Sequence, residues 1–558
     1  MKPHKLLFFS SFLLLFSCNQ SKYDLIIKNG LIFDGNGTTP ILADIAIKND
    51  TIAFIGNVSF YSDAKEIIDA KGLAVTPGFV NMLSWSTESL IEDGRSMGEI
   101  MQGVTLEVMG EGDSMGPISD AMKSDAKKSQ GNIKYDIPWN TLGEYLSYLE
   151  KRGVSTNVAS FVGASTVRAM ELGYANRPPK PDELDRMKNH VKLAMEEGAM
   201  GVASALIYTP GTYSDTHELI ELSKVASEYG GTYISHLRSE GNRLEEAVNE
   251  LITIAKEANI HAEIYHLKAA GKSNWPKIDK VITKIDSARK AGINVTADMY
   301  NYIAGATGLD AAMPPWVQEG GFDQWSRRLK SGTIREQVGR EMSSPQNDWE
   351  NLCLAAGADK TLLIGFKQDS LRKYIGKTLA EVANIKKTTW YETAMDLVVA
   401  DGSRVDVVYF LMSEENVKKQ IQLPYMSFCS DAASMNPAGV FLKSSNHPRA
   451  YGNFSRLLGK YVREEKVITL QEAIRKLTSL PCDNLKVQKR GRLAVGNYAD
   501  IVVFDPNKIQ DKATFEKPHQ LSEGMRHVFV NGKQVVKDGL HTGVKSGRFV
   551  KGPGWKSE

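Results

Sequence analysis

Residues 231–266, GTYISHLRSEGNRLEEAVNELITIAKEANIHAEIYH, carry the pattern that decides the fold. The stretch opens with a strand-like run, GTYISH (231–236), and continues with apolar residues at helical spacing in NRLEEAVNELITIAKEAN (242–259). It closes with a second strand-like run, HAEIYH (261–266). This order and length are typical of one β-α-β unit with two parallel strands.

The same alternation runs from about residue 80 to residue 480. Six further strand-like runs are VNMLSW (80–85), GVTLEVMG (103–110), TNVASFVG (156–163), AMGVASAL (199–206), NVTADMY (294–300) and MSFCSD (426–431). Eight such units favour a closed (β/α)8, TIM-like barrel over residues 77–302 and 426–484, and an open doubly wound sheet is the alternative. The stretch 303–425 is too long for one β-α unit, so it predicts an inserted subdomain after strand 7.

Short strands of one style occur near both ends of the chain. Residues 23–76 and 485–545 contain runs such as YDLIIKNGLIFDG and GRLAVGNYADIVVFDP, broken by Gly, Asn or Asp as hairpins are. We therefore expect one small β-sandwich domain formed from both chain ends.

The first residues predict an export signal. Lys2 and Lys5 precede the apolar run LLFFSSFLLLFS, which is followed by Cys18. This layout is typical of a signal peptide over residues 1–17, and its LFSC ending resembles a bacterial lipobox with Cys18 as the lipidated residue. Residues 18–22 would be a tether, and the protein would lie in the bacterial cell envelope, lipid-anchored to a membrane and facing the periplasm or the exterior.

Bulk composition is that of an ordinary globular protein, with 42% apolar and 24% charged residues. The net charge of +2 gives no basic field that would attract nucleic acid. The four cysteines, Cys18, Cys353, Cys429 and Cys482, show no paired spacing. A disulfide framework or a zinc site made only of cysteines is therefore not expected.

Four predicted strands carry, at or near their ends, side chains that are suited to catalysis. His236 and His266 end neighbouring strands, and barrel enzymes place their chemistry at these C-terminal ends. Imidazole is a common zinc ligand, so the pair is a candidate metal site. Asp431 ends the eighth strand, where it could ligate the metal, accept a proton or simply cap a loop. Asp298 has the same ambiguity.

Several motifs together resemble the N-acyl-D-amino-acid deacylase (D-aminoacylase) family of the amidohydrolase superfamily, from about residue 24 to residue 540. They are LIIKNGLIFDGNG, VTPGFVN, QGVTLEVMGEG, SHLRSEG, YHLKAAG, DMYNYIAGATGL, SDAASMNPAGVFLKSSNHPRAYGNFSRLLGKYVRE and GRLAVGNYADIVVFDP. The resemblance implies a barrel with a small β-sandwich and an insertion. It also implies zinc-dependent hydrolysis of an amide next to a carboxylate.

The resemblance also implies roles for individual residues. His236 and His266 match the histidines of the tighter metal position, and Asp431 matches the general base and acid. Lys268, Tyr300 and Arg449 match residues that grip the substrate carboxylate. Arg can meet a carboxylate with two parallel hydrogen bonds, which agrees with that role.

This chain departs from the family at the metal ligands. The family's first-strand His-x-His is replaced by Leu83 and Trp85, and the Asp before it by Asn81. A third-strand His is replaced by Ala164. Because neither Leu nor Trp ligates zinc, we expect one tightly bound Zn²⁺ rather than two.

The cysteine that completes the tighter site is also missing, since Gly112 stands in its place. Two histidines and one carboxylate form an accepted catalytic zinc set. Glu111 is the first choice for the carboxylate because Gly110 and Gly112 would let the backbone turn it inward. Asp113 and Glu107 are the alternatives.

The expected function is therefore hydrolysis of the linear amide bond of N-acyl-D-amino acids or related substrates with a free carboxylate. One alternative is another cyclic-amide or D-peptide hydrolase of the same superfamily. The other is a decayed barrel that acts as a binding protein.

Overall fold

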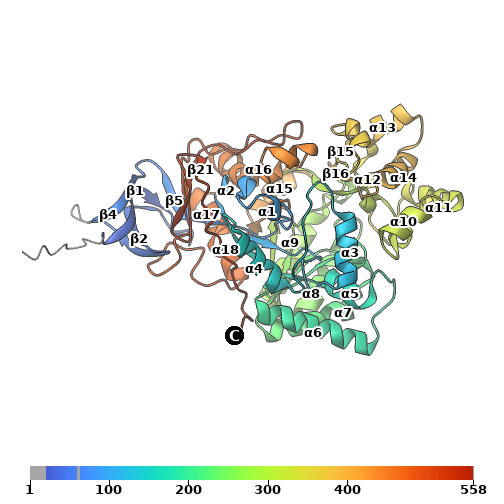
Figure 1. Cartoon of the computed structure of the whole chain (residues 1–558), viewed down its shortest axis with the longest axis horizontal. Helices are drawn as coiled ribbons and strands as arrows, with labels where there is room; N and C mark the ends of the chain where they lie inside the picture. Colours follow the sequence, from blue (N-terminus) through green and yellow to red (C-terminus); the bar gives the residue numbers. More distant parts are fainter. Residues whose placement is uncertain (1–20, 59–62, 557–558) are drawn as a thin grey trace, which may run out of the picture.

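The computed structural model describes residues 21–58 and 63–556. The predicted signal peptide and Cys18 lie outside these residues. A small β domain occupies one end of the elongated molecule, a barrel the middle, and the segment between the seventh and eighth barrel strands the other end (Figure 1). In the described part of the chain, no helix combines the length and apolarity needed to cross a membrane.

The barrel contains all eight predicted strands in the predicted order. They are β6 (Phe79–Asn81), β7 (Val104–Met109), β8 with β9 (Asn157–Ser160, Val162–Gly163), β10 (Gly201–Ala205), β11 (Thr232–His236), β12 (His261–Ile264), β13 (Val295–Met299) and β17 (Met426–Phe428). The third strand is broken, because β8 pairs with β7 whereas β9 pairs with β10. All these pairings are parallel.

Backbone hydrogen bonds between the first and last strands close the barrel. The amide of Met82 donates to the carbonyl of Phe428 at 3.2 Å, and the amide of Asp431 donates to the carbonyl of Leu83 at 3.0 Å. Closure satisfies the backbone groups that an open sheet would leave at its edges. The predicted (β/α)8 fold class is confirmed, and the open sheet is excluded.

Amphipathic helices cover the outside of the barrel. They include α4 (Leu142–Arg152), α5 (Ala164–Leu172), α6 (Pro181–Glu197), α7 (Thr216–Glu228), α8 (Leu244–Glu257), α9 (Lys277–Lys290), α15 (Glu414–Ile421), α16 (Arg449–Arg456), α17 (Leu470–Leu477) and α18 (Ser479–Asn484). Helix α8 shows the principle, since Leu244, Val248, Leu251 and Ile254 lie on its buried face at helical spacing. Burial of each such side chain stabilises the fold by about 1.5–3 kcal/mol.

The β domain joins both ends of the chain in one sheet, with strand order β21-β20-β19-β18-β5-β1-β2-β3 and β4 beside β1. From the N-terminal part come β1 (Tyr23–Ile32), β2 (Ile41–Lys48), β3 (Thr51–Gly56), β4 (Ala64–Asp69) and β5 (Ala74–Pro77). From the C-terminal part come β18 (Ile501–Phe504), β19 (Met525–Val530), β20 (Lys533–Lys537) and β21 (Leu540–His541). The junction is the antiparallel pair of β5 and β18. Residues from both parts, such as Ile45 and Val503, share a core separate from that of the barrel.

The segment between β13 and β17 forms its own small sheet with helices around it (Figure 1). The sheet order is β14-β16-β15, with β14 (Gly305–Gly308), β15 (Thr361–Gly365) and β16 (Asp406–Tyr409). Its helices are α10 (Phe322–Arg328), α11 (Gly332–Met342), α12 (Leu352–Ala356), α13 (Leu379–Lys386) and α14 (Trp390–Asp401).

Two further features complete the fold. Short helices α1 (Ser89–Glu92) and α2 (Met97–Ile100) follow the first barrel strand, and α3 (Asp120–Ser129) follows the second. Residues 546–556, which follow the predicted β domain, run back to the barrel. There the amide of Gly547 donates to the carbonyl of Val154 at 2.8 Å.

Candidate metal centre

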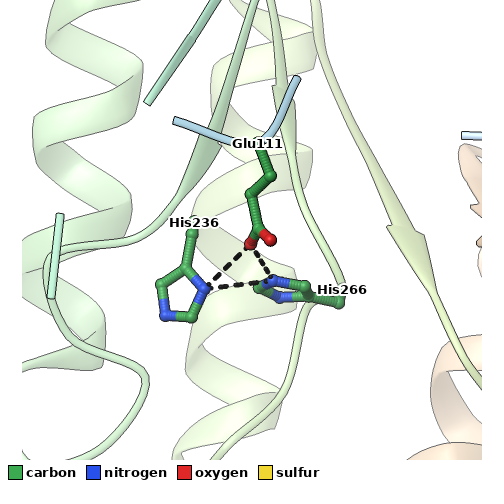
Figure 2. A group of neighbouring side chains, drawn as sticks. All are labelled: Glu111, His236 and His266. Carbon is green, nitrogen blue, oxygen red and sulfur yellow. Dashed lines mark hydrogen bonds and ion pairs between the residues drawn. The ribbon is translucent and has the colours of Figure 1, made fainter. Parts of the chain in front are cut away.

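Glu111, His236 and His266 converge at the C-terminal end of the barrel strands (Figure 2). His236 is the last residue of β11, and His266 lies two residues after β12. Glu111 Oε1 is 3.1 Å from His236 Nδ1 and 2.8 Å from His266 Nε2, and the two ring nitrogens are 3.1 Å apart. The three side chains are at most 6% exposed, so they form a dry cluster with its donor atoms already facing one another.

Two glycines explain why Glu111 points inward. Gly110 and Gly112 have φ angles of +106° and +67°, which side chains rarely allow. A Cβ on Gly112 would lie 2.6 Å from the Cβ of Ala205, so this backbone has no room for a cysteine there. The turn presents Glu111 instead, as the sequence predicted.

The charges of the cluster are strongly coupled. Burial would raise the pKa of the Glu111 carboxyl, but its hydrogen bonds to His236 and His266 outweigh burial and hold that pKa below its ordinary value. Burial and the ammonium of Lys268 lower the pKa of His266, yet nearby carboxylates, Asp431 first, raise it to about 10. The cluster thus favours a positive charge between its carboxylates.

The donor set fits a zinc ion. With bonds of about 2.0–2.1 Å, two ligands of a tetrahedral zinc lie about 3.3 Å apart. The three observed separations are 2.8–3.1 Å, so the side chains need to open by only a few tenths of an ångström. His236 Nε2, the ring atom that faces away from the cluster, is buried without a hydrogen-bond partner.

The predicted base and the predicted carboxylate-binding arginine contact each other. Asp431 Oδ2 lies 2.8 Å from Arg449 Nη1, and both side chains are buried. The guanidinium of Arg449 stacks 4.3 Å from the ring centroid of Tyr300. Burial raises the pKa of Asp431 although Arg449 opposes the shift. The structure therefore brings Asp431, Arg449 and Tyr300 together beside His266, whose ring lies 6.4 Å from that of Tyr300.

Glu240 also belongs to the site, although no motif in the sequence predicted it. Its Oε1 accepts a hydrogen bond from Lys268 Nζ at 2.6 Å and lies 3.0 Å from His266 Nδ1. Lys268 Nζ is also 2.7 Å from the same Nδ1. Glu240 follows His236 by four residues, but it lies in the loop after β11, where residue spacing does not predict which side chains meet. Lys268 is thus already paired with a buried carboxylate.

Leu83 and Trp85, just after the first barrel strand, stand where the resembled family has two histidines. Leu83 is completely buried, whereas Trp85 is 38% exposed. The indole Nε1 of Trp85 donates a hydrogen bond to Glu111 Oε2 at 3.0 Å. Asn81 donates to Glu99 Oε1 at 3.0 Å and to Ser430 Oγ at 2.7 Å.

The other candidate residues lie outside the metal cluster. Glu107 is buried lower in the barrel, where it accepts hydrogen bonds from Ser84 Oγ and Thr156 Oγ1, both at 2.7 Å. The side chain of Asp113 is exposed. Asp298 accepts a hydrogen bond from the backbone amide of His266 at 2.7 Å, so it supports the histidine from below.

The chain is similar to several known proteins. A model described as "Amidohydrolase family" matches residues 442–536. D-aminoacylase of Alcaligenes xylosoxydans xylosoxydans is 29% identical over 532 residues, which cover 95% of this chain and 97% of that protein.

Two solved structures cover 95% of this chain and 100% of their own. N-acyl-D-glutamate deacylase of Bordetella bronchiseptica, complexed with zinc and a phosphonate mimic of the reaction's tetrahedral intermediate, is 27% identical with a TM-score of 0.78. A D-aminoacylase whose binuclear metal centre shows one-metal activation and second-metal attenuation is 28% identical with a TM-score of 0.78.

The likeness thus spans the barrel, the β-sandwich and the segment between β13 and β17. Over nearly its whole length, the chain is thus similar to D-aminoacylase and N-acyl-D-glutamate deacylase, and residues 442–536 match the amidohydrolase model.

Proposed function

We propose that this protein is a zinc-dependent hydrolase of the amide bond in N-acyl-D-amino acids that carry a free α-carboxylate. One observation carries the proposal: a preformed cluster of Glu111, His236 and His266 lies beside a buried Asp431–Arg449 pair. The first group suits a metal ion, and the second offers a proton acceptor together with a receptor for a carboxylate. The names of the similar proteins support this substrate class.

Glu111, His236 and His266 would hold one zinc ion. When bound, zinc acts as a Lewis acid that polarises the scissile carbonyl and makes water more acidic. The charges favour a cation here. The carboxylates of Glu111, Glu240 and Asp431 meet around the cluster, whereas the fixed cations are Lys268 and Arg449, one fewer. One zinc is also consistent with the one-metal activation of the similar D-aminoacylase.

Asp431 would move the proton. Its carboxylate takes a proton from the attacking water and later gives it to the leaving amide nitrogen. Burial keeps this carboxylate away from bulk water, and Arg449 holds its orientation through Oδ2.

Arg449, Tyr300 and Lys268 would place the substrate. The buried guanidinium of Arg449 receives the α-carboxylate, and its stacking on Tyr300 fixes the plane of the guanidinium. Lys268 adds positive charge while Glu240 holds it in place. The amide next to the carboxylate then lies over the metal ligands, which lowers the entropic cost of reaction.

For the location, we propose that the protein is exported and anchored in the bacterial envelope through a lipid on Cys18. The support is the order of basic residues, apolar run and cysteine in residues 1–18. The substrate would therefore be met outside the cytoplasm.

The test is a substrate panel on zinc-loaded protein. N-acetyl derivatives of D- and L-amino acids should be compared, each together with its α-amide. We expect hydrolysis of D-acids, little hydrolysis of L-acids and poor hydrolysis of the amides. Absence of turnover across the panel with zinc bound would overturn the proposal, and equal rates on acids and amides would remove the role of Arg449.

A further inference from the structure

The indole of Trp85 is aimed at a candidate metal ligand. The backbone amide of Trp85 donates to the carbonyl of Ala432 at 3.0 Å, which fixes the start of the side chain. From there Nε1, a donor only, reaches Glu111 Oε2 at 3.0 Å. A hydrogen bond to a carboxylate is stronger than one between neutral groups. Trp85 therefore holds the orientation of the Glu111 carboxylate.

The two carboxylate oxygens of Glu111 consequently have different partners. Oε1 faces both histidines, whereas Oε2 faces the indole. A second metal ion bridged by this carboxylate would need Oε2 and would have to displace the indole N–H.

The remaining surroundings offer little to a second ion. Leu83 is fully buried and apolar, and its backbone carbonyl accepts the amide of Asp431. The carboxylate of Asp431 is itself paired with Arg449 at 2.8 Å. The groups near a second metal position are thus either apolar or already bound to other protein groups.

We propose that Trp85 is a positioning residue that restricts Glu111 to one ligating oxygen and closes the centre to a second metal ion. The inference rests on the proposed function, because it presupposes that Glu111 ligates zinc. It also gives Trp85 a role of its own. Trp85 stands in place of a histidine that ligates metal in the resembled family, and its side chain orients Glu111 in the remaining metal site.

The first test removes the indole N–H. Trp85→Phe keeps an aromatic ring in place, and Trp555→Phe, at a 47% exposed tryptophan near the C-terminus, is the matched control. Zinc affinity should be measured by competition with a chromogenic chelator, and zinc content by elemental analysis. We expect Trp85→Phe to raise the zinc Kd about 10-fold, the scale usual for a lost contact to a metal ligand. Trp555→Phe should leave the Kd unchanged.

The second test rebuilds the lost ligands. Leu83→His/Trp85→His should bind two zinc ions per chain, whereas the wild type should bind one even at millimolar zinc. The inference fails if the wild type takes up a second zinc or if Trp85→Phe binds zinc like the wild type. A folded double variant that still holds one zinc would also overturn it, because other groups would then exclude the second ion.

These outcomes separate the two proposals. A wild type that binds no zinc refutes the proposed function itself. A wild type with one zinc and an unchanged Kd in Trp85→Phe refutes only the role of Trp85. Circular dichroism of each variant confirms that the comparison is made between folded proteins.

Discussion

Replacement of Glu240 by Gln tests whether this carboxylate, which contacts His266 and Lys268, stabilises the candidate metal centre. The carboxylate lies 2.6 Å from Lys268 Nζ and 3.0 Å from His266 Nδ1, and both side chains are at most 5% exposed. Gln keeps the volume and removes the charge, so Lys268 loses its counter-ion in a dry environment. Loss of one partner of a buried ion pair costs about 3–5 kcal/mol, and the free energy of unfolding should fall by that amount.

The same change should weaken zinc binding. A carboxylate that accepts the Nδ1 proton of a histidine leaves the Nε2 lone pair free for the metal. The second nitrogen of His266, Nε2, is the atom that faces Glu111. Loss of this outer contact typically weakens metal binding 10- to 100-fold, and we expect a Kd increase of about 30-fold for Glu240→Gln.

Zinc competition and urea unfolding followed by circular dichroism measure the two effects. Glu350→Gln is the matched control, since Glu350 accepts hydrogen bonds from Ser239 Oγ at 2.6 Å and the Gly241 amide at 2.5 Å without reaching the histidines. Burial raises the pKa of Glu350 to about 7, so its charge contributes less. A double variant, Glu240→Gln/Lys268→Met, should regain stability but not zinc affinity. Wild-type zinc affinity in Glu240→Gln would refute the reasoning.

Four further outcomes are expected. Asp431→Asn should keep zinc but lower kcat at least ~100-fold, as for loss of a general base, which stopped-flow or steady-state assays measure. Arg449→Met should mainly raise KM and reduce the preference for acids over amides; an unchanged ratio would contradict its role. Burial lowers the pKa of His261 to about 4. The unfolded chain, with an ordinary pKa near 6.5, therefore takes up the proton first as the pH falls, so about 2 kcal/mol of stability is lost between pH 7.5 and 5. His261→Gln should show a correspondingly smaller loss in metal-free melts over this range. Cys18→Ser should release the protein from the membrane fraction or block its processing, and unchanged membrane association would disprove lipidation.

The local sequence pattern was sufficient to predict the barrel and the proximity of His236 and His266. Strand and helix periods are properties of short segments, so the eight strands and the helices between them can be predicted without knowledge of the whole fold. Parallel strands end at one edge, so His236 and His266, thirty residues apart at equivalent places, had to become neighbours. The positive φ angles of Gly110 and Gly112 made Glu111 the preferred carboxylate for the same local reason.

Pairings across the barrel were decided only by the tertiary structure. Trp85 and Glu111 belong to loops after different strands, and Asp431, which follows β17, contacts Arg449 at the start of α16. The ion pair of Lys268 and Glu240 could not be predicted either, because nothing in the sequence shows which opposite charge each residue meets. Which charges pair in a buried site depends on burial and on distances of a few ångströms, and sequence spacing specifies neither. The amino-acid order therefore determined the barrel and the approach of the two histidines, whereas the closed three-dimensional packing decided which partner each buried charge found.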